Sequence, residues 1–310
     1  GKRNMVEQLL IPVRRCRKLS GTLRLKSAAV LASPSSADEV PLRQLAEDLG
    51  PRGIRTRIVR NAWGTATIRL KRAPQVVGRD AYRLRISSDG VEILASDDPG
   101  AYYGVQTLRE LLNCHGLRLP ACDIHDAPDF PRRGVYHDCS RGKVPTLKTL
   151  KDLVERLGRW KINELQLYIE NVFTFAHHPK IGRGYSPFTP EELLELQDHC
   201  RLHHVRLVGS LASFGHMEKI LMLPEYQHLG EMPGFHGRPG GTTLCPTDPG
   251  SIRLMSELYE EFVPLFEAED FNVCCDETWE LGKGRSRRRA DKAGTGRLYL
   301  DFLLKLKKLC

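Results

Sequence analysis

The feature that most constrains the fold is an alternation of short apolar segments with amphipathic stretches in the second half of the chain. Four apolar segments have the length of β-strands: 134–139, 164–169, 205–209 and 271–275. Each is followed by a stretch with helical spacing, and these begin near residues 147, 190, 249 and 296. Strand–helix units in series predict a parallel sheet with right-handed crossovers. An open doubly wound sheet and a (β/α)8 barrel both fit this pattern.

The first part of the chain has a different pattern. Residues 82–86 alternate apolar and polar side chains, residues 91–95 form a second short strand, and Asp89-Gly90 between them suits a hairpin turn. Residues 38–49 and 100–113 have apolar positions at helical spacing. The segment Ala-Pro-Asp-Phe-Pro at 127–131 separates the two patterns. We therefore expect an N-terminal α/β domain over 1–127 and a second domain over 128–310.

The length of the second part bears on its architecture. The chain has 310 residues, and a complete (β/α)8 barrel typically needs about 250 for itself alone. The sequence ends inside a helical pattern, Leu-Lys-Leu-Lys-Lys-Leu-Cys. The expected fold is therefore an α+β sandwich-like domain followed by a TIM barrel that is truncated after about four β/α units.

Composition and charge narrow the classes of function. The formal net charge is +9, and much of the excess lies in short basic clusters such as 14–18, 287–289 and 305–308. No zinc finger, RNA-recognition signature or aromatic-interleaved basic strand accompanies them, so nucleic acid is not an expected partner. No apolar run approaches ~20 residues, so a membrane partner is not expected either. The nine cysteines include no C-x-x-C pair and no signal peptide is visible, which favours the cytoplasm over the periplasm or secretion.

Polar side chains follow the predicted strands at their C-terminal ends, where parallel-sheet proteins build their sites. Two acids, a histidine and an arginine on one rim fit hydrolysis of an anionic or polyhydroxylated substrate. The residues are Arg133, His137, Asp138 and Arg141 around the first strand, Glu170 and Asn171 after the second, His216 after the third, and Asp276 and Glu277 after the fourth.

Other chemistries find less support in the spacing. His137, His216 and Asp276 could ligate a divalent ion, but no H-E-x-x-H or similar spacing occurs, so neither a metal nor another cofactor is expected. The chain has neither a P-loop nor a G-x-S-x-G elbow. A glycosidase that uses Glu170 and Glu277 as its carboxylate pair remains an alternative.

Three stretches of the sequence resemble glycoside hydrolase family 20, the β-N-acetylhexosaminidases. Residues 98–112, DPGAYYGVQTLRELL, are similar to the helix that closes the family's N-terminal domain. Residues 130–141, FPRRGVYHDCSR, resemble its first barrel strand, and residues 271–277, FNVCCDE, resemble its fourth. The family usually has Gly-Gly where this chain has Cys274-Cys275.

The resemblance implies roles for individual residues. Glu277 matches the general acid/base, and Asp276 matches the residue that orients the substrate's 2-acetamido group. Arg133 matches an arginine that holds sugar hydroxyls, and His216 matches a histidine that hydrogen-bonds near the acid/base. Glu170 and Asn171 stand at the family's acidic strand end. The ring of Trp279 could stack on a sugar.

The implied function is removal of terminal β-linked N-acetylhexosamine, GlcNAc or GalNAc, by a retaining, substrate-assisted mechanism. In such enzymes the acetamido oxygen is the nucleophile, which explains why two acids can be adjacent in sequence. The expected partner is a carbohydrate with a terminal N-acetylhexosamine. A non-catalytic half barrel that binds carbohydrate, or self-associates into a homodimer, remains an alternative.

Overall fold

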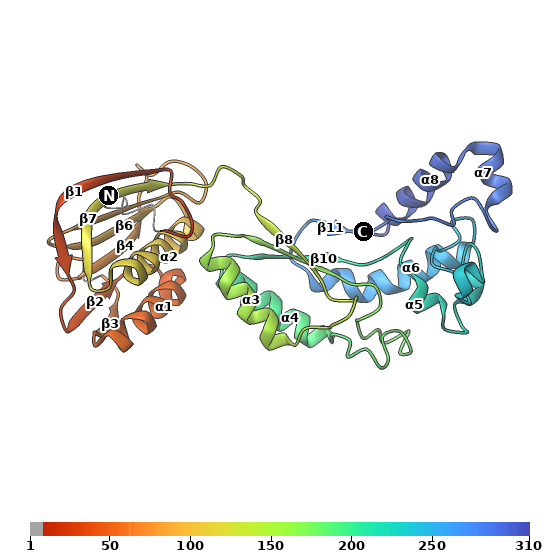
Figure 1. The fold of residues 1–310 in the computed structure, drawn as a ribbon, viewed down its shortest axis with the longest axis horizontal. Helices are drawn as coiled ribbons and strands as arrows, with labels where there is room; N and C mark the ends of the chain where they lie inside the picture. Colours follow the sequence, from red (N-terminus) through yellow and green to blue (C-terminus); the bar gives the residue numbers. More distant parts are fainter. Residues whose placement is uncertain (1–8, 62) are drawn as a thin grey trace. The chain divides into compact units, whose positions relative to one another are not determined.

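A computed structural model describes residues 9–61 and 63–310, and it divides the chain into two compact units. The first unit comprises residues up to Arg133 together with 155–163 and 202–204, and the second comprises the remainder. Figure 1 shows the elements of both units in chain order. Residues 1–8 of the expected N-terminal domain lie outside the described residues.

The first unit is a two-layer α/β structure built on a seven-stranded sheet in the order β1-β7-β5-β6-β4-β2-β3. Strands β1, β7, β5 and β6 are antiparallel neighbours, whereas β6, β4, β2 and β3 are parallel. The strands are β1 (Arg15–Arg24), β2 (Ala28–Ala32), β3 (Arg55–Val59), β4 (Ile68–Arg72), β5 (Tyr82–Ser87), β6 (Gly90–Ala95) and β7 (Arg118–Asp126).

Two helices, α1 (Glu39–Leu49) and α2 (Asp98–His115), bury their apolar residues against one face of this sheet. Alternate residues of the strands, such as Leu84 and Ile93, enter that core, while Arg83 and Arg85 point to the other face. The predicted hairpin is confirmed, since Ser87 pairs with Gly90 at the turn between β5 and β6. Gly90 has a φ of 139°, and a Cβ there would lie 2.5 Å from the Thr67 carbonyl oxygen.

The second unit contains a four-stranded parallel sheet in the order β11-β10-β9-β8, so that each strand lies beside its neighbour in sequence. Helices α3, α4 and α6 lie on one side of the strands (Figure 1). The strands are β8 (Gly134–Asp138), β9 (Glu164–Tyr168), β10 (Arg206–Ser210) and β11 (Phe271–Asn272). The helices are α3 (Leu147–Arg159), α4 (Pro190–Leu202), α5 (Glu218–Leu221), α6 (Pro249–Phe262), α7 (Arg287–Ala293) and α8 (Thr295–Lys307).

The two faces of the parallel sheet differ in polarity. Pairing in register puts Tyr136, Gln166 and Val208 on one face, and therefore also Tyr168 and Ser210. The opposite face carries apolar residues such as Leu165, Leu167 and Leu207, which are buried. A parallel sheet covered by helices on both faces is apolar on both. A face with tyrosines, an amide and a serine is instead suited to polar ligands.

The α/β class and the order of elements agree with the sequence-based prediction, and the main difference lies in the fourth strand. That strand was expected over 271–275, but β11 has only two residues. Asn272 ends it, because its Oδ1 accepts a hydrogen bond of 3.0 Å from the Cys274 amide and Cys274 has a φ of 43°. The start of α4 is as expected: Thr189 Oγ1 accepts from the Glu192 amide, and Glu192 Oε2 accepts from the Thr189 amide.

The expected division at 127/128 stays a prediction, because the two compact units are not continuous in sequence. The C-terminal end of α3 and the segment 202–204 belong to the first unit. Among the residues that the structure describes, no helix is long and apolar enough to cross a membrane. All nine cysteines carry free thiols, and the vicinal pair Cys274 and Cys275 is buried.

Candidate functional site

The candidate site of the second unit is the acid pair that follows β11. His216, in the loop after β10, reaches both acids: its Nε2 lies 3.3 Å from Asp276 Oδ2 and 3.2 Å from Glu277 Oε2. The side chains of Asp276 and Glu277 are 64% and 52% exposed, whereas that of His216 is 15% exposed. Two solvent-accessible carboxylates therefore share one largely buried imidazole nitrogen. Such a group can donate, accept and relay protons to a bound ligand.

Unusual backbone conformations gather at this cluster. His216, Cys274 and Glu277 have positive φ values of 55°, 43° and 50°, in the left-handed region that non-glycine residues seldom adopt. Each such residue costs roughly 1 kcal/mol or more and persists only where the surrounding structure holds it. Concentration of this strain on three residues around one acid pair is typical of a functional site.

Close packing fixes the loop of His216 against the acid pair. Gly215 approaches the backbone of Asp276 so closely that a Cβ at residue 215 would overlap the Asp276 carbonyl oxygen. From the other side, Tyr299 of α8 donates a 2.9 Å hydrogen bond from its hydroxyl to the Cys275 carbonyl. Both contacts constrain the backbone immediately next to the two carboxylates.

The end of β9 contributes a buried polar group. The Tyr168 hydroxyl donates to Glu170 Oε1 at 3.0 Å, and Lys219 Nζ lies 3.3 Å from Glu170 Oε2. The Tyr168 ring stands edge-on to the His216 ring, with 6.2 Å between centroids. Burial and the neighbouring Glu170 charge raise the pKa of Tyr168, so its hydroxyl stays protonated as a donor. Glu170 is thus linked to the His216 cluster through Tyr168.

Asn171 and Trp279 lie in opposite environments. Asn171 is buried, and its Oδ1 has no hydrogen-bond partner within the described chain. Trp279 is 63% exposed, and its amide donates to the Glu277 carbonyl at 2.9 Å. The indole therefore stands in solvent two residues beyond the acid/base candidate.

Tyr136 extends the polar surface from β8 towards β10. Its hydroxyl lies 2.7 Å from Ser210 Oγ and 3.1 Å from Cys274 Sγ. Burial, followed by the hydrogen bond with Cys274, raises the pKa of Tyr136, and burial likewise raises the pKa of the Cys274 thiol. Both groups are therefore neutral hydrogen-bonding groups near neutral pH. The Cys274 side chain occupies space beside the acid pair as a neutral thiol.

Asp138 and Arg141 complete the end of β8. Burial opposes ionisation of Asp138, but hydrogen bonds from the amides of Ser140 and Arg141 and from the Arg141 guanidinium outweigh it, so the pKa of Asp138 is lowered. Arg141 also lies over the Tyr168 ring, 5.0 Å from its centroid. The carboxylate of Asp138 thereby orients a cation at the same end of the sheet.

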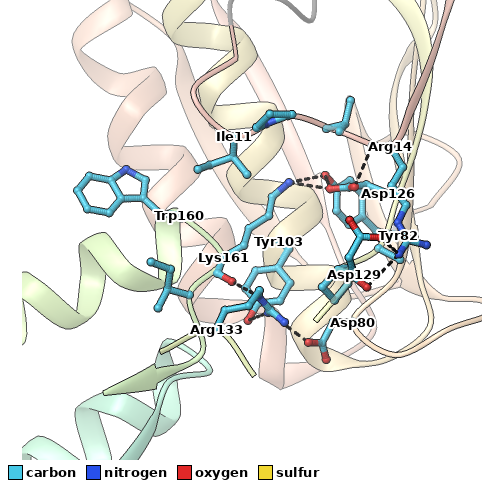
Figure 2. Close-up of a pocket in the computed structure, with 15 residues that line it drawn as sticks. Ile11, Arg14, Asp80, Tyr82, Tyr103, Asp126, Asp129, Arg133, Trp160 and Lys161 are labelled. Carbon is cyan, nitrogen blue, oxygen red and sulfur yellow. Dashed lines mark hydrogen bonds and ion pairs between the residues drawn. The ribbon is translucent and has the colours of Figure 1, made fainter. Parts of the chain in front are cut away.

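Arg133 belongs to the first unit, in contrast to the other predicted site residues. It lines a pocket of about 270 Å³, which Figure 2 shows. Its Nε donates to the Lys161 carbonyl at 2.6 Å and its Nη1 to the Phe130 carbonyl at 2.7 Å. Its Nη2 lies 3.3 Å from the Tyr103 hydroxyl and 3.4 Å from Asp80 Oδ2. The guanidinium is therefore engaged by the first unit's own residues.

The charged groups of this pocket pair with one another. Lys161 Nζ lies 2.8 Å from both Asp126 Oδ2 and the Tyr82 hydroxyl, as the dashed lines in Figure 2 show. Burial lowers the pKa of Lys161 although Asp126 favours its charged form. Because Asp80 and Asp126 are both neutralised by cations, the pocket offers no pair of free carboxylates. The acid pair after β11 is the better candidate for hydrolytic chemistry.

The cluster after β11 is also where a cation could be held. The ligand atoms of His216, Asp276 and Glu277 all lie within 4.8 Å of one another. One imidazole and two carboxylates would leave an ion such as Zn²⁺ open to further ligands. His137, which the sequence offered as a third ligand beside His216 and Asp276, is not in this cluster. The same distances also suit hydrogen bonds between the three side chains.

Sequence reasoning did not select two tyrosines that build this site, Tyr136 and Tyr168. Strand alternation contained a signal for both, because they share a face with Asp138 at the end of β8. No local pattern pointed to Lys219, because its contact with Glu170 depends on how the loop after β10 folds back. Of the predicted residues, the structure brings His216, Asp276 and Glu277 together directly.

Comparison with known proteins identifies relatives of this chain. Residues 9–127 match the family model described as "Glycosyl hydrolase family 20, domain 2". Human "Hexosaminidase D" is 25% identical over 178 residues, which is 56% of this chain and 35% of that protein. The resemblance to glycoside hydrolase family 20 that the sequence indicates is therefore confirmed.

Solved structures share the fold. A chitobiase from Flavobacterium johnsoniae superposes with a TM-score of 0.82 at 22% identity, over 98% of this chain and 52% of its own. The N-acetyl-beta-hexosaminidase of Streptomyces plicatus, solved with Thio-NAglucal, also gives 0.82 at 20% identity, over 98% and 63%. This chain spans between about a third and two thirds of the length of these three proteins.

Proposed function

We propose that this chain is a member of glycoside hydrolase family 20, as the match of residues 9–127 indicates, and that it hydrolyses terminal β-linked N-acetylhexosamine. The observation that carries the proposal is the acid pair itself. Asp276 and Glu277 are adjacent, solvent-accessible and within 3.3 Å of the same imidazole nitrogen. The relatives named above include a hexosaminidase, a chitobiase and an N-acetyl-beta-hexosaminidase, which supports the same substrate class for this chain.

The adjacency favours substrate assistance. A retaining glycosidase with a protein nucleophile needs its two carboxyl groups about 5 Å apart on opposite sides of the anomeric carbon. Consecutive residues that both turn towards one histidine do not suit that arrangement. If the substrate's acetamido oxygen is the nucleophile, one acid suffices for the leaving group, and the other can stabilise charge on the acetamido nitrogen.

The roles follow from this division. Glu277 protonates the glycosidic oxygen as the bond to the anomeric carbon breaks, and later removes a proton from the attacking water. Asp276 orients the acetamido group and balances the positive charge of the oxazolinium intermediate. His216, held between both carboxylates, positions them relative to each other.

Further residues complete the proposed substrate surface. Trp279 presents an exposed ring on which a sugar face can stack. Glu170 and Asn171, which are both buried after β9, are proposed as substrate-binding residues on the family resemblance. Arg133 is proposed as a substrate ligand on the family resemblance alone. To bind sugar hydroxyls, its guanidinium would give up some of its hydrogen bonds within the first unit.

The architecture proposed for the second unit is that of consecutive units of a (β/α)8 barrel. Its strands are parallel, neighbouring in space in the order of the sequence, polar on one face and apolar on the face towards the helices. In such a barrel the polar face is the interior, and the acid pair lies at the C-terminal end where barrel enzymes bind substrate.

Two chromogenic substrates test the activity. We expect the chain to release 4-nitrophenol from its β-N-acetylglucosaminide and not from its β-glucoside, which lacks the acetamido nucleophile. Equal hydrolysis of both would exclude substrate assistance. Hydrolysis of neither, with binding of N-acetylglucosamine or with a dimeric mass in light scattering, would support the non-catalytic alternative of a carbohydrate-binding or self-associating chain.

A further inference from the structure

Two glutamates in the second unit are fully buried outside the acid–histidine cluster. Glu231 lies in the loop after β10 and Glu280 in the loop after β11, and both side chains are 0% exposed. Neither forms an ion pair within the described chain. A buried carboxylate without a cation is costly unless several donors satisfy it. Both glutamates must therefore be held by strong hydrogen bonds, and each finds its donors in the other's loop.

Glu280 binds the loop after β10. Its Oε1 accepts from the Thr242 amide at 2.5 Å and from the Thr242 hydroxyl at 2.6 Å. Its Oε2 packs against Gly241, whose φ of 78° and missing Cβ permit this approach. Oε2 has no hydrogen-bond partner within the described residues. Thr242 is consequently the anchor of this carboxylate.

Thr242 is also hydrogen-bonded to the residue that follows His216. Its carbonyl accepts a 2.9 Å hydrogen bond from the amide of Met217, the residue after His216. At the other end, Glu280 is three residues beyond Glu277, joined by a turn in which the Trp279 amide donates to the Glu277 carbonyl. A continuous path of hydrogen bonds and short stretches of backbone therefore links Glu277, the acid/base candidate, to His216.

Glu231 makes the reciprocal contact further from the acid pair. Its Oε1 accepts from the Ser286 hydroxyl at 2.6 Å and from the Ser286 and Gly284 amides at 3.1 and 3.2 Å. These donors lie seven to nine residues beyond Glu277. Glu231 fastens the same two loops with comparable burial, but it does not lie on the path between Glu277 and His216.

We propose that Glu280 is a positioning residue that sets the geometry between Glu277 and His216 through Thr242. The proposal rests on the proposed hydrolase function for its kinetic consequences. Two hydrogen bonds of 2.5 and 2.6 Å to one carboxyl oxygen of Glu280 restrict the position of Thr242 relative to Glu280. Because Glu277 is exposed and has a strained backbone, its carboxylate depends on such outside contacts for its place.

Kinetics of three variants separate positioning from general loop stability. Glu280→Ala should lower kcat roughly 10- to 100-fold, since displacement of a reacting group by about 1 Å has effects of that size. KM should change much less, because sugar binding does not use Glu280. Glu280→Gln keeps an acceptor oxygen and should recover part of the loss. The matched control, Glu231→Ala, should lower the melting temperature similarly and leave kcat near that of the wild type. Equal losses of kcat in the two alanine variants would overturn the proposal.

Thr242 provides a milder test in case Glu280→Ala does not fold. Thr242→Val removes only the hydroxyl donor and should lower kcat, whereas Thr242→Ser keeps the hydroxyl and should restore it. Wild-type kcat in Thr242→Val would overturn the proposal.

Hydrogen exchange tests the same path without catalysis. Peptides that contain the Met217 and Thr242 amides should exchange faster in Glu280→Ala than in Glu231→Ala, and equal rates would contradict the positioning path. If the wild type hydrolyses no substrate, the proposed function fails while this measurement still decides the role of Glu280.

Discussion

At the scale of single residues, the acid pair makes the sharpest prediction. Glu277→Gln keeps the size of the side chain and removes its ability to donate and accept the catalytic proton. We expect kcat on the N-acetylglucosaminide to fall roughly 10²- to 10⁴-fold, the usual contribution of a general acid–base group. Michaelis kinetics of the purified variant, with its far-ultraviolet circular dichroism as a folding control, check this. A kcat within threefold of wild type would assign the acid role elsewhere.

Gly215 is predicted to be intolerant of any side chain. Gly215→Ala would place a methyl group on the Asp276 carbonyl oxygen, so the backbone of the acid pair must move. We expect kcat to fall and the urea midpoint to drop. Gly184→Ala is a matched control: Gly184 has a positive φ of 85° but nothing within 4 Å of a Cβ. It should lose some stability and keep its kcat, and a similar kcat loss in both variants would contradict the packing argument.

The sequence predicted the chemical types of the site residues better than their contacts. Asp276, Glu277 and His216 could be selected because they follow strands whose ends must meet in a parallel sheet. The engagement of Arg133 by Asp80 and Tyr103 could not be inferred, since it depends on contacts between residues that are 30 and 53 positions apart. The left-handed backbone conformation of Glu277 likewise could not be predicted from the amino-acid sequence.

At the scale of elements, the N-terminus of α4 offers a test that is independent of function. Thr189 and Glu192 cap each other's amides, which satisfies two donors that the helix leaves unpaired. Thr189→Ala should destabilise the protein by about 1 kcal/mol. Thr189→Ser, which keeps the capping oxygen, should lose much less, and urea denaturation measures both. Equal destabilisation by the two substitutions would mean that the cap bond contributes nothing.

The N-terminus of α6 should carry a pH-dependent contribution to stability. Burial opposes ionisation of Asp248, but hydrogen bonds from Arg285 and the Gly250 amide outweigh it and lower the pKa of Asp248. The folded state therefore favours the carboxylate, and this stabilisation is present above the unfolded pKa of about 3.9 and is lost as pH falls through the folded value. The difference in melting temperature between wild type and Asp248→Asn should be present at pH 7 and shrink in acid. A difference that is constant with pH would contradict this.

Helices and strands were predicted well where the hydrophobic periodicity extends over many residues. They were predicted poorly where a single residue determines the end of the element. Helix α3 and strands β8 and β9 follow from repeated apolar spacing. The early end of β11 follows from a single side chain, Asn272, whose amide oxygen competes with the strand for the Cys274 amide. Such a local competition outweighs the apolar character of residues 273–275.

At the scale of the whole molecule, the first unit depends on a segment that is remote in sequence. Lys161 stands after α3, yet its amine pairs with Asp126 of β7, and both side chains are about nine-tenths buried. Lys161→Met leaves Asp126 without its cation and should cost about 3–5 kcal/mol. The double variant Lys161→Met/Asp126→Asn removes both charges and should recover part of this loss in urea denaturation. Additive losses would show that the pair is not coupled.

The same contact explains why the domain boundary was the least accessible prediction. The Pro-rich stretch at 127–131 marks a change of pattern, and the family match ends at residue 127. The compact units of the structure divide the chain differently, because residues 155–163 and 202–204 pack with the first unit. The hydrophobic pattern of the sequence indicates the order of elements along the chain. The burial of Lys161 depends instead on residues that are close in space and distant in sequence.

The positive φ at Cys274 has a consequence for how relatives of this chain can be found. The family usually has glycine at this position, and glycine adopts that conformation freely. Here a cysteine occupies it at a φ of 43°, a conformation that glycine would adopt with less strain. A search template written in residue letters would reject this chain at Cys274. A template that required only an Asp-Glu pair and a positive φ two residues before it would retain this chain.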